Sequence, residues 1–345
     1  MDNYTVNQLK ELIKGNNIEL HTGKKSYDLR KKDYYDFYIY LNTKGTENKL
    51  SITSGEAIRN IVKFLPPPVM REFASSSKSM LQQANLTQER DIMLNEKNID
   101  EFLKLPFLTY YVNRLTINHI DDNKLISVFK KLNYLKGLKI ITKFNFKLLE
   151  YIPNLEHLDV SSNGIRENII SFSENLKYIP KLKYLDMSNS IIGHEIENFK
   201  FIPNLQYLNV SNCNIGDIIQ FSRNLKYLPN LQHLDVSAND IKENIIPFSE
   251  NLKYVPNLQH LNISHNRIGE SIVHFSENLK YVPNLQHLDI SWDHIDESII
   301  PFSENLKYVP NLLYLNLRSI GTEVDIASFS ENLKYIPNLQ HLEYI

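Results

Sequence analysis

The chain has 345 residues, of which 42% are hydrophobic and 23% are charged, and its formal net charge is −2. This balance is typical of a folded protein and excludes a wholly disordered chain, and the near-neutral charge excludes a chain-wide basic surface for nucleic acid or anionic membrane. Residues 1–14 lack the apolar core of a signal peptide, no run of about 18 apolar residues follows, and Cys213 is the single cysteine. We therefore expect an intracellular protein that is not secreted and contacts no membrane.

Residues 1–45 are predicted to form a small helical hairpin. Thr5-Val-Asn-Gln8 is a capping box that begins an amphipathic helix, and a glycine-bounded loop over residues 15–26 leads into a second helix. This order is similar to the SAP motif, a helix–loop–helix that binds DNA in several nuclear proteins. The resemblance implies that basic side chains of the hairpin contact phosphates, namely Lys24, Lys25 and Arg30. The alternative is a solvated charged helix, which has the same composition.

Residues 46–105 are predicted to form a second helical segment. Thr53-Ser-Gly-Glu56 is another capping box, and Ile-Val-Lys-Phe-Leu-Pro follows at residues 61–66. This segment resembles the central and later part of an F-box, whose helices bind the Skp1 adaptor of cullin–RING ubiquitin ligases while C-terminal repeats hold the substrate. The resemblance implies that six residues contact Skp1: Ile61, Phe64, Leu65, Pro66, Val69 and Met70. The leading Leu-Pro-x-Glu of the motif is absent. The alternative is a cap over the end of the following repeats, and the two roles are compatible.

Residues 106–345 are repetitive. Prolines stand at 153, 180, 203, 229, 256, 283, 310 and 337, mostly 26 or 27 residues apart. Similar phrases follow them, such as Pro229-Asn-Leu-Gln-His-Leu-Asp-Val-Ser-Ala-Asn-Asp-Ile241, with the pattern LxxLxLxxNxI. This pattern resembles the leucine-rich-repeat family over about two thirds of the chain. Two degenerate units precede the clear ones, Val112-x-x-Leu115-x-Ile117 and Leu135-x-x-Leu138-x-Ile140.

Each unit is predicted to contain one short strand and one short helix. Leu231, Leu234 and Val236 should point inward from the strand and its approach, whereas Phe248 and Leu252 lie on one helical face. A proline in the first helical turn, such as the one at 247, is tolerated there. The predicted fold class is therefore α/β, a leucine-rich-repeat solenoid with parallel inner strands and outer short helices. We expect about nine to ten units of 20–27 residues in this horseshoe.

An asparagine near the end of each phrase is expected to turn the chain and to satisfy backbone groups of neighbouring turns. Asn163, Asn239 and Asn266 hold this position, and Cys213 stands there as a buried thiol. Three other units depart from the pattern, with Ser190, Asp293 and Ile320. We therefore expect an asparagine ladder that is interrupted at these units.

Polar side chains recur at two positions of each predicted strand. Histidines at the third pattern position and aspartates at the fifth should project from the concave face, about 4.8 Å from strand to strand. Histidine beside aspartate could hold a metal or act as acid and base. However, these columns recur because the unit was copied, and catalysis needs one unique pocket. We expect no enzyme activity, no metal and no cofactor, and a concave face that binds protein through His233, Asp235, His260, His287 and Asp289.

The eighth pattern position diverges among the units, and divergence among copied units indicates selection by a partner. Its residues are Ser162, Asn189, Asn212, Ala238, His265, Trp292 and Ser319. The seventh position is serine in six consecutive units and then Arg318. We therefore add His265, Trp292 and Arg318 to the predicted concave-face site, because tryptophan and arginine are favoured interface anchors. The alternative is that Trp292 fills a gap beside its strand.

Three functions remain open. The first is an intracellular F-box-like adaptor whose repeats bind a protein to be ubiquitinated. The second is a scaffold or regulator that binds one partner without recruiting a ligase, and the third is a DNA-associated protein anchored by the SAP-like hairpin. The combination of segments resembles proteins of large DNA viruses of amoebae, which implies the host cytoplasm or nucleus as its location.

Overall fold

A computed structural model describes residues 91–104, 112–132, 135–193, 198–215, 217–319 and 326–344. The chain divides into two compact units, Met1–Arg90 with Lys104–Val112, and Asp91–Leu103 with Asn113–Ile345. The SAP-like hairpin, residues 46–90 of the F-box-like segment and Ile320 lie outside the described residues, and the predictions made for them remain predictions. The second unit is the repeat unit.

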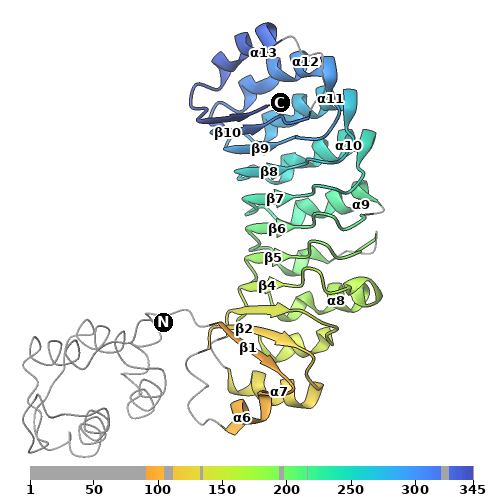
Figure 1. Ribbon diagram of the computed structural model, residues 1–345, viewed down its shortest axis with the longest axis vertical. Coiled ribbons are helices and arrows are strands. Elements are labelled where there is room, and N and C mark those ends of the chain that lie inside the picture. The colour runs from red at the N-terminus through yellow and green to blue at the C-terminus, as the bar shows by residue number, and fades with distance from the viewer. Residues whose placement is uncertain are drawn as a thin grey trace, which may run out of the picture. The chain divides into compact units, whose positions relative to one another are not determined.

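One parallel sheet of eleven strands runs through the described part of the repeat unit, in the chain order β1 to β11 (Figure 1). The strands are β1 (Asp91–Asn95), β2 (Arg114–Asn118), β3 (Gly137–Ile140), β4 (His157–Asp159), β5 (Tyr184–Asp186), β6 (Tyr207–Asn209), β7 (His233–Asp235), β8 (His260–Asn262), β9 (His287–Asp289), β10 (Tyr314–Asn316) and β11 (His341–Glu343). The register pairs equivalent residues, so that Leu261 of β8 lies between Leu234 and Leu288. The predicted parallel inner strands are confirmed. The sheet also begins at β1, earlier than residue 106, where the sequence predicts the repeats to start.

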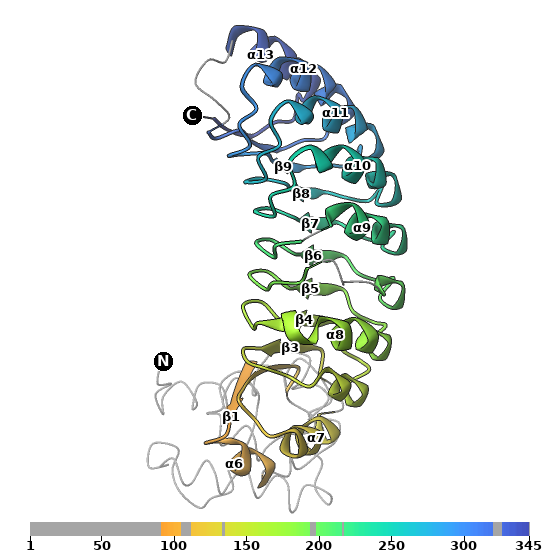
Figure 2. The same cartoon turned by 90° about the vertical axis from the view of Figure 1, so that its right-hand side faces the viewer.

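The return segments lie on the opposite side of the sheet from the inner face, as short helices (Figure 2). The α-helices are α6 (Ile99–Lys104), α7 (Asp122–Lys131), α8 (Ile169–Asn175), α9 (Ile218–Ser222), α10 (Ile245–Glu250), α11 (Ile272–Glu277), α12 (Ile299–Glu304) and α13 (Ile326–Asn332). The 3₁₀ turns are η2 (Phe146–Tyr151), η3 (Ile165–Asn168), η4 (Leu176–Tyr178), η5 (Phe199–Phe201), η6 (Arg223–Tyr227), η7 (Lys242–Asn244), η8 (Asn251–Tyr254), η9 (Gly269–Ser271), η10 (Asn278–Tyr281), η11 (Asp296–Ser298), η12 (Asn305–Tyr308) and η13 (Leu333–Tyr335). Pro247 is the third residue of α10, where a missing N–H leaves no bond unmade. Among the described residues, no helix has the length and apolar character needed to cross a membrane.

The core lies between the strands and the helices and is built from columns of identical residues. Leu234, Leu261 and Leu288 are wholly buried beneath the sheet, and Phe248 and Phe275 are wholly buried beneath the helices. Each such side chain contributes about 1.5–3 kcal/mol when it leaves water. The core of a single unit is open on both sides, so it buries these residues fully only between two neighbouring units.

The asparagine ladder forms as predicted at Asn239 and Asn266. The Asn239 side-chain amide donates to the carbonyl oxygens of Val210, Val236 and Ser237 at 2.9–3.0 Å, while its Oδ1 accepts the Cys213 N–H at 3.1 Å. Asn266 in turn accepts the Asn239 N–H at 2.8 Å. Each side-chain amide therefore joins its own unit to the preceding one, and the backbone N–H of the same residue bonds to the amide of the next unit. These bonds satisfy backbone groups that water cannot reach.

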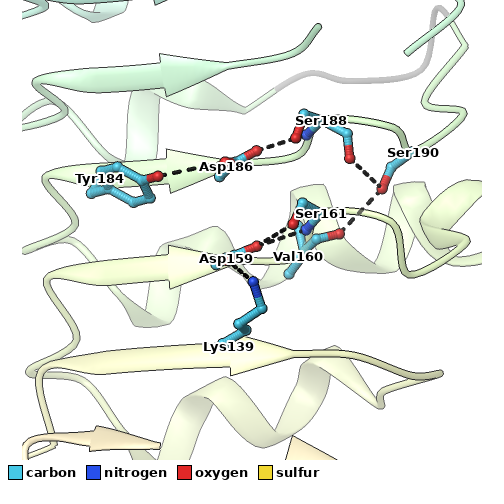
Figure 3. A network of polar contacts seen from close by, with 8 residues as sticks. All are labelled: Lys139, Asp159, Val160, Ser161, Tyr184, Asp186, Ser188 and Ser190. Atoms are coloured by element: carbon cyan, nitrogen blue, oxygen red, sulfur yellow. Dashed lines mark hydrogen bonds and ion pairs between the residues drawn. The ribbon is translucent and has the colours of Figure 1, made fainter. Parts of the chain in front are cut away.

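Ser190 interrupts the run of ladder asparagines, as predicted, but it keeps the donating part of their hydrogen bonding. The Ser190 hydroxyl donates to the Val160 and Ser188 carbonyls at 3.1 and 3.4 Å, the same two kinds of carbonyl that an asparagine would reach (Figure 3). The Cys213 thiol likewise donates to the Met187 carbonyl at 3.0 Å and is fully buried, as expected. A short side chain suffices because the turn brings these carbonyls close to Cβ.

Asp293 keeps half of the ladder. Its Oδ1 accepts the Asn266 N–H at 2.6 Å, as an asparagine would. Its Oδ2 replaces the donating amide and is buried without a hydrogen-bond partner in the described structure. Burial raises the pKa of this carboxyl group to about 8, because a charged oxygen without a donor is costly in the core.

Candidate functional site

The inner face of the sheet carries a continuous row of rings. The first residue of each strand from β4 to β11 is aromatic: His157, Tyr184, Tyr207, His233, His260, His287, Tyr314 and His341. We call this row the aromatic ladder. The rings of His233, His260 and His287 stack at centroid distances of 3.8 Å with interplanar angles of 14° and 18°. Tyr207 and Tyr314 continue the stack at either end, at 4.2 and 4.0 Å.

The three stacked histidines His233, His260 and His287 are held in the neutral form. Burial, with a smaller contribution from the other histidines of the stack, lowers the pKa of His233 to about 4 and that of His260 to about 3. Burial also lowers the pKa of His287, although Asp289 and Glu343 oppose this shift. Neutral rings stack face to face without charge repulsion, so the stack from Tyr207 to Tyr314 is an uncharged aromatic strip at neutral pH.

The aspartates beside the ladder end their strands. The Asp235 Oδ1 accepts the Ser237 N–H at 2.9 Å and the Ser237 hydroxyl at 2.6 Å, while its Oδ2 accepts the Asn262 amide at 3.1 Å. Asp289 has the same pattern with Ser291 at 3.0 and 2.7 Å. Burial raises the pKa of Asp235, and its hydrogen bonds partly offset this. These carboxylates therefore hold the chain in a side-chain-capped turn at the end of each strand.

Figure 3 shows the same arrangement three units before Asp235, at Asp159, with one addition. The Asp159 Oδ1 accepts the Ser161 N–H at 2.9 Å and its hydroxyl at 2.6 Å. The Asp159 Oδ2 accepts Lys139 Nζ of the neighbouring strand at 2.7 Å. In the next unit the Tyr184 hydroxyl approaches Asp186 at 3.5 Å. The inner face is therefore more polar around β3–β5 than along the stacked histidines.

A second surface lies in the turns that follow the strands. We call it the rim, and it consists of Ala238, Asp240, His265, Arg267, Trp292 and His294, which line a hollow of about 480 Å³. Trp292 is 49% exposed and stacks on His265, with ring centroids 5.3 Å apart and an interplanar angle of 11°. All six residues are left-handed, with φ between 53° and 61°. This geometry turns the side chains at positions 292 and 294 outward while Asp293 between them stays buried.

The structure divides the predicted concave-face residues into two groups. The strands hold His233, Asp235, His260, His287 and Asp289, and the turns hold His265, Trp292 and Arg318. Arg318 follows β10 and forms an ion pair with Glu343 of β11 at 3.2 Å, and it does not line the rim hollow. Sequence reasoning missed Asp240, Arg267 and His294. All three stand at the tenth pattern position, directly after the buried residue of the asparagine ladder. Because the eighth position, directly before that residue, was predicted to be exposed, the tenth could have been predicted in the same way.

Other chemistry is sparse in the described residues. No group of three or more histidine, cysteine or carboxylate side chains is placed there to hold a metal ion. Burial raises the pKa of the Cys213 thiol to about 12, so the thiol stays protonated. The aspartates and histidines of the inner face are hydrogen-bonded or stacked within the sheet, so their arrangement has a structural explanation.

Comparison with known proteins agrees with this architecture. Residues 203–250 match a family model described as Leucine Rich repeats (2 copies), residues 257–279 match Leucine Rich Repeat, and residues 151–169 match Leucine Rich repeat. These segments of the chain are therefore leucine-rich repeats, and such repeats typically serve as protein–protein interaction modules. Among solved structures, an internalin (InlF) from Listeria monocytogenes is similar, with 15% identity over 84% of this chain and 89% of that chain and a TM-score of 0.44. No curated protein matches the sequence.

Proposed function

We propose that the repeat unit binds a protein partner through the inner face of its sheet. The observation that carries this proposal is the aromatic ladder, in which rings on successive strands stack at 3.8–4.2 Å from Tyr184 to Tyr314. Aromatic side chains are enriched at protein interfaces because they offer a large contact area with few rotatable bonds. Here their conformations are already fixed by the neighbouring rings, so binding loses little side-chain entropy.

Photo-crosslinking tests which side of the repeat unit contacts the partner. A benzophenone amino acid would replace His260 on the inner face, where a ring is already stacked on both sides. The matched control would replace Tyr254, which is 39% exposed in η8 on the return side. The full chain is used in both cases. We expect a partner adduct from position 260 and none from position 254, and an adduct from position 254 alone would contradict the proposal.

We further propose an adaptor role in which the F-box-like segment recruits an intracellular ubiquitin ligase. The support is the sequence Ile-Val-Lys-Phe-Leu-Pro at residues 61–66 together with downstream repeats suited to hold a substrate. Its test is capture of purified Skp1 by the full chain. We expect capture by the parent protein, and loss of capture when Leu65 and Pro66 are both changed to Ala with an unchanged melting temperature. Failure of the parent to capture Skp1 would leave a scaffold that binds its partner without a ligase.

The remaining candidate is association with DNA through the SAP-like hairpin. It rests on Lys24, Lys25 and Arg30 in the hairpin. Phosphate contacts make binding fall steeply with salt, so retention on duplex DNA that is lost between low and physiological salt supports this role. A triple change of these residues to Gln that leaves retention unaltered would contradict it.

A further inference from the structure

The stack of rings at the rim ends abruptly. In successive units the eighth pattern position holds Ala238, His265 and Trp292, and the last two stack at 5.3 Å. The unit of Ala238 supplies only a methyl group beside His265, and the hollow of about 480 Å³ lies along these three residues. A planar group placed over Ala238 would continue the stack by one further ring, at the spacing that the units impose.

The buried asparagine ladder fixes the backbone of the residues that line this hollow. Asn239 lies between Ala238 and Asp240, and its amide donates to carbonyls of two units. Asn266 anchors His265 and Arg267 in the same way. The flanking residues are fixed in the left-handed region, with φ of 55° and 54° at Ala238 and Asp240. The hollow therefore exists before a ligand arrives, and a ligand does not have to order it.

The charges around the hollow favour an anion. Asp240 forms ion pairs with Lys242 Nζ at 2.8 Å and with Arg267 Nη1 at 3.3 Å. One carboxylate thus faces two permanent cations, and the Arg267 side chain remains 70% exposed. Arg267 lines the same hollow as His265, so a carboxylate next to an incoming ring could pair with its guanidinium.

We propose that the rim hollow binds one aromatic side chain of a protein partner, carried by a segment with acidic residues on either side of it. The ring stacks on His265 over Ala238, and a flanking carboxylate pairs with Arg267. This inference rests on the proposed protein-binding function and names the chemistry of the partner segment. It also explains why the eighth pattern position differs among these units, because the small side chain of Ala238 leaves a space next to His265 and Trp292.

The intrinsic fluorescence of Trp292 reports on this hollow without a label, because the chain contains a single tryptophan. The probes are three capped peptides with the central sequences Glu-Phe-Glu, Glu-Leu-Glu and Lys-Phe-Lys, each titrated into the full chain. We expect saturable change in fluorescence with Glu-Phe-Glu, and binding weaker by about fivefold or more for the other two. Equal binding of the Glu-Leu-Glu peptide would overturn the proposal that the hollow binds an aromatic ring. Equal binding of the Lys-Phe-Lys peptide would overturn the proposal that acidic flanking residues pair with Arg267.

Substitutions at the hollow give the matched controls. Ala238→His copies the residue of the next unit and fills the space with a ring, so it should abolish peptide binding. Ala238→Asn places there the residue that Asn189 and Asn212 provide in earlier units, also left-handed, and should leave binding within about twofold. Arg267→Gln, at an exposed position, should remove the preference for acidic flanks and keep the preference for phenylalanine. Undiminished binding to a folded Ala238→His protein would overturn the proposal.

Two further results separate this inference from the proposed function. Tighter binding of a ten-nucleotide oligothymidylate than of the acidic peptide would assign the hollow to a nucleobase and overturn the assignment to protein. Partner crosslinking from position 260 that persists while no acidic peptide binds would overturn the hollow alone. Peptide binding without crosslinking from position 260 would leave the hollow standing and refute the inner-face proposal.

Discussion

The inner face and the rim are built on the same repeating backbone and use it differently. On the inner face, His260 is stacked on both sides and Asp235 accepts three hydrogen bonds. At the rim, Trp292 has one stacking neighbour and is half exposed. Residues that hold neighbouring units together are kept alike from unit to unit, whereas residues that project from a fixed turn can change singly. Repetition therefore maintains the stacked surface of the inner face, and divergence gives the rim its individual side chains.

The largest expected effect on the free energy of unfolding comes from the buried asparagine ladder, which fixes the backbone beneath both surfaces. Asn266→Ala removes an amide that donates to the Val236, Ile263 and Ser264 carbonyls and accepts the Asn239 N–H. Leaving these buried groups without partners should lower the free energy of unfolding by roughly 3–5 kcal/mol. Urea denaturation measures this loss.

Asn284→Ala is the matched control for that experiment. The exposed Asn284 amide donates only to the Pro256 carbonyl, at 3.1 Å. Its removal should cost less than about 1 kcal/mol, because water can replace the bond. Similar losses in the two variants would show that the buried ladder is not the common support of the inner face and the rim.

The next effect comes from Asp293, whose folded-state pKa of about 8 lies far above the ordinary aspartate value of 3.8. A group with a raised folded-state pKa favours the folded state less and less as the pH rises from 3.8 through 8. Asp293→Asn removes this penalty and restores the donating amide. It should stabilise the protein by about 2–3 kcal/mol at pH 8 and by less at pH 5, as measured by urea denaturation at both values. A gain that is equal at the two pH values would contradict a buried carboxyl group that titrates.

The aromatic ladder predicts a smaller effect of the opposite sign with pH. The folded-state pKa values of His233 and His260, about 4 and 3, lie below the ordinary histidine value of 6.5. As the pH falls below 6.5, the unfolded chain binds protons that the folded ladder excludes, so stability is lost down to about pH 3. After allowance for solvent screening of half-buried rings, each histidine should cost about 1–2 kcal/mol at pH 4.5.

His260→Tyr isolates this effect, because tyrosine holds the same place at Tyr207 and Tyr314. The variant should lose less melting temperature than the parent between pH 7 and pH 4.5. Comparing the two proteins at each pH cancels the contribution of Asp293. An identical loss in both would mean that His260 is not excluded from protonation in the folded state.

The smallest effect on stability is expected at the rim. Trp292→Ala removes a half-exposed ring with one stacking partner, so the free energy of unfolding should change by no more than about 0.5–1 kcal/mol. Binding of the partner should fall by about 2 kcal/mol or more, as measured by calorimetry. A large loss of stability with unchanged affinity would reassign Trp292 to packing and remove the contrast between the two surfaces.

The sequence predicts most of this fold because the leucines and the ladder asparagine each have one place in the repeat. Leu234 and Asn239 could be assigned from spacing alone, and so could the exposure of Trp292, which stands between the buried positions of Ile290 and Asp293. β1 could not be assigned in this way. Asp91–Asn95 departs from the pattern and becomes a strand because it pairs with β2, where Leu94 lies opposite Ile117.

The details of the site were less predictable, since they depend on backbone direction. The pattern places His233 and His260 in one column, but the face-to-face stacking and the resulting low pKa depend on burial that spacing does not reveal. The hydroxyl of Ser190 reaches the ladder carbonyls only because the turn brings them near. Arg267 and His294 reach the rim because the backbone is left-handed on both sides of each buried ladder residue. A left-handed backbone is difficult to predict from the sequence at residues other than glycine.

The matching register of the units bears on how such a chain changes its length. A segment from Pro256 to Val282 could be excised and Val255 joined to Pro283 with the same residue pair at the junction. The Asn284 amide would then meet the Pro229 carbonyl in place of that of Pro256, and its present bond is repeated by Asn257 with Pro229. Unequal recombination between copies would therefore yield a shorter or longer protein whose interfaces are already complete. It would also remove or duplicate single exposed side chains, so gain and loss of whole units is a direct route to new recognition surfaces.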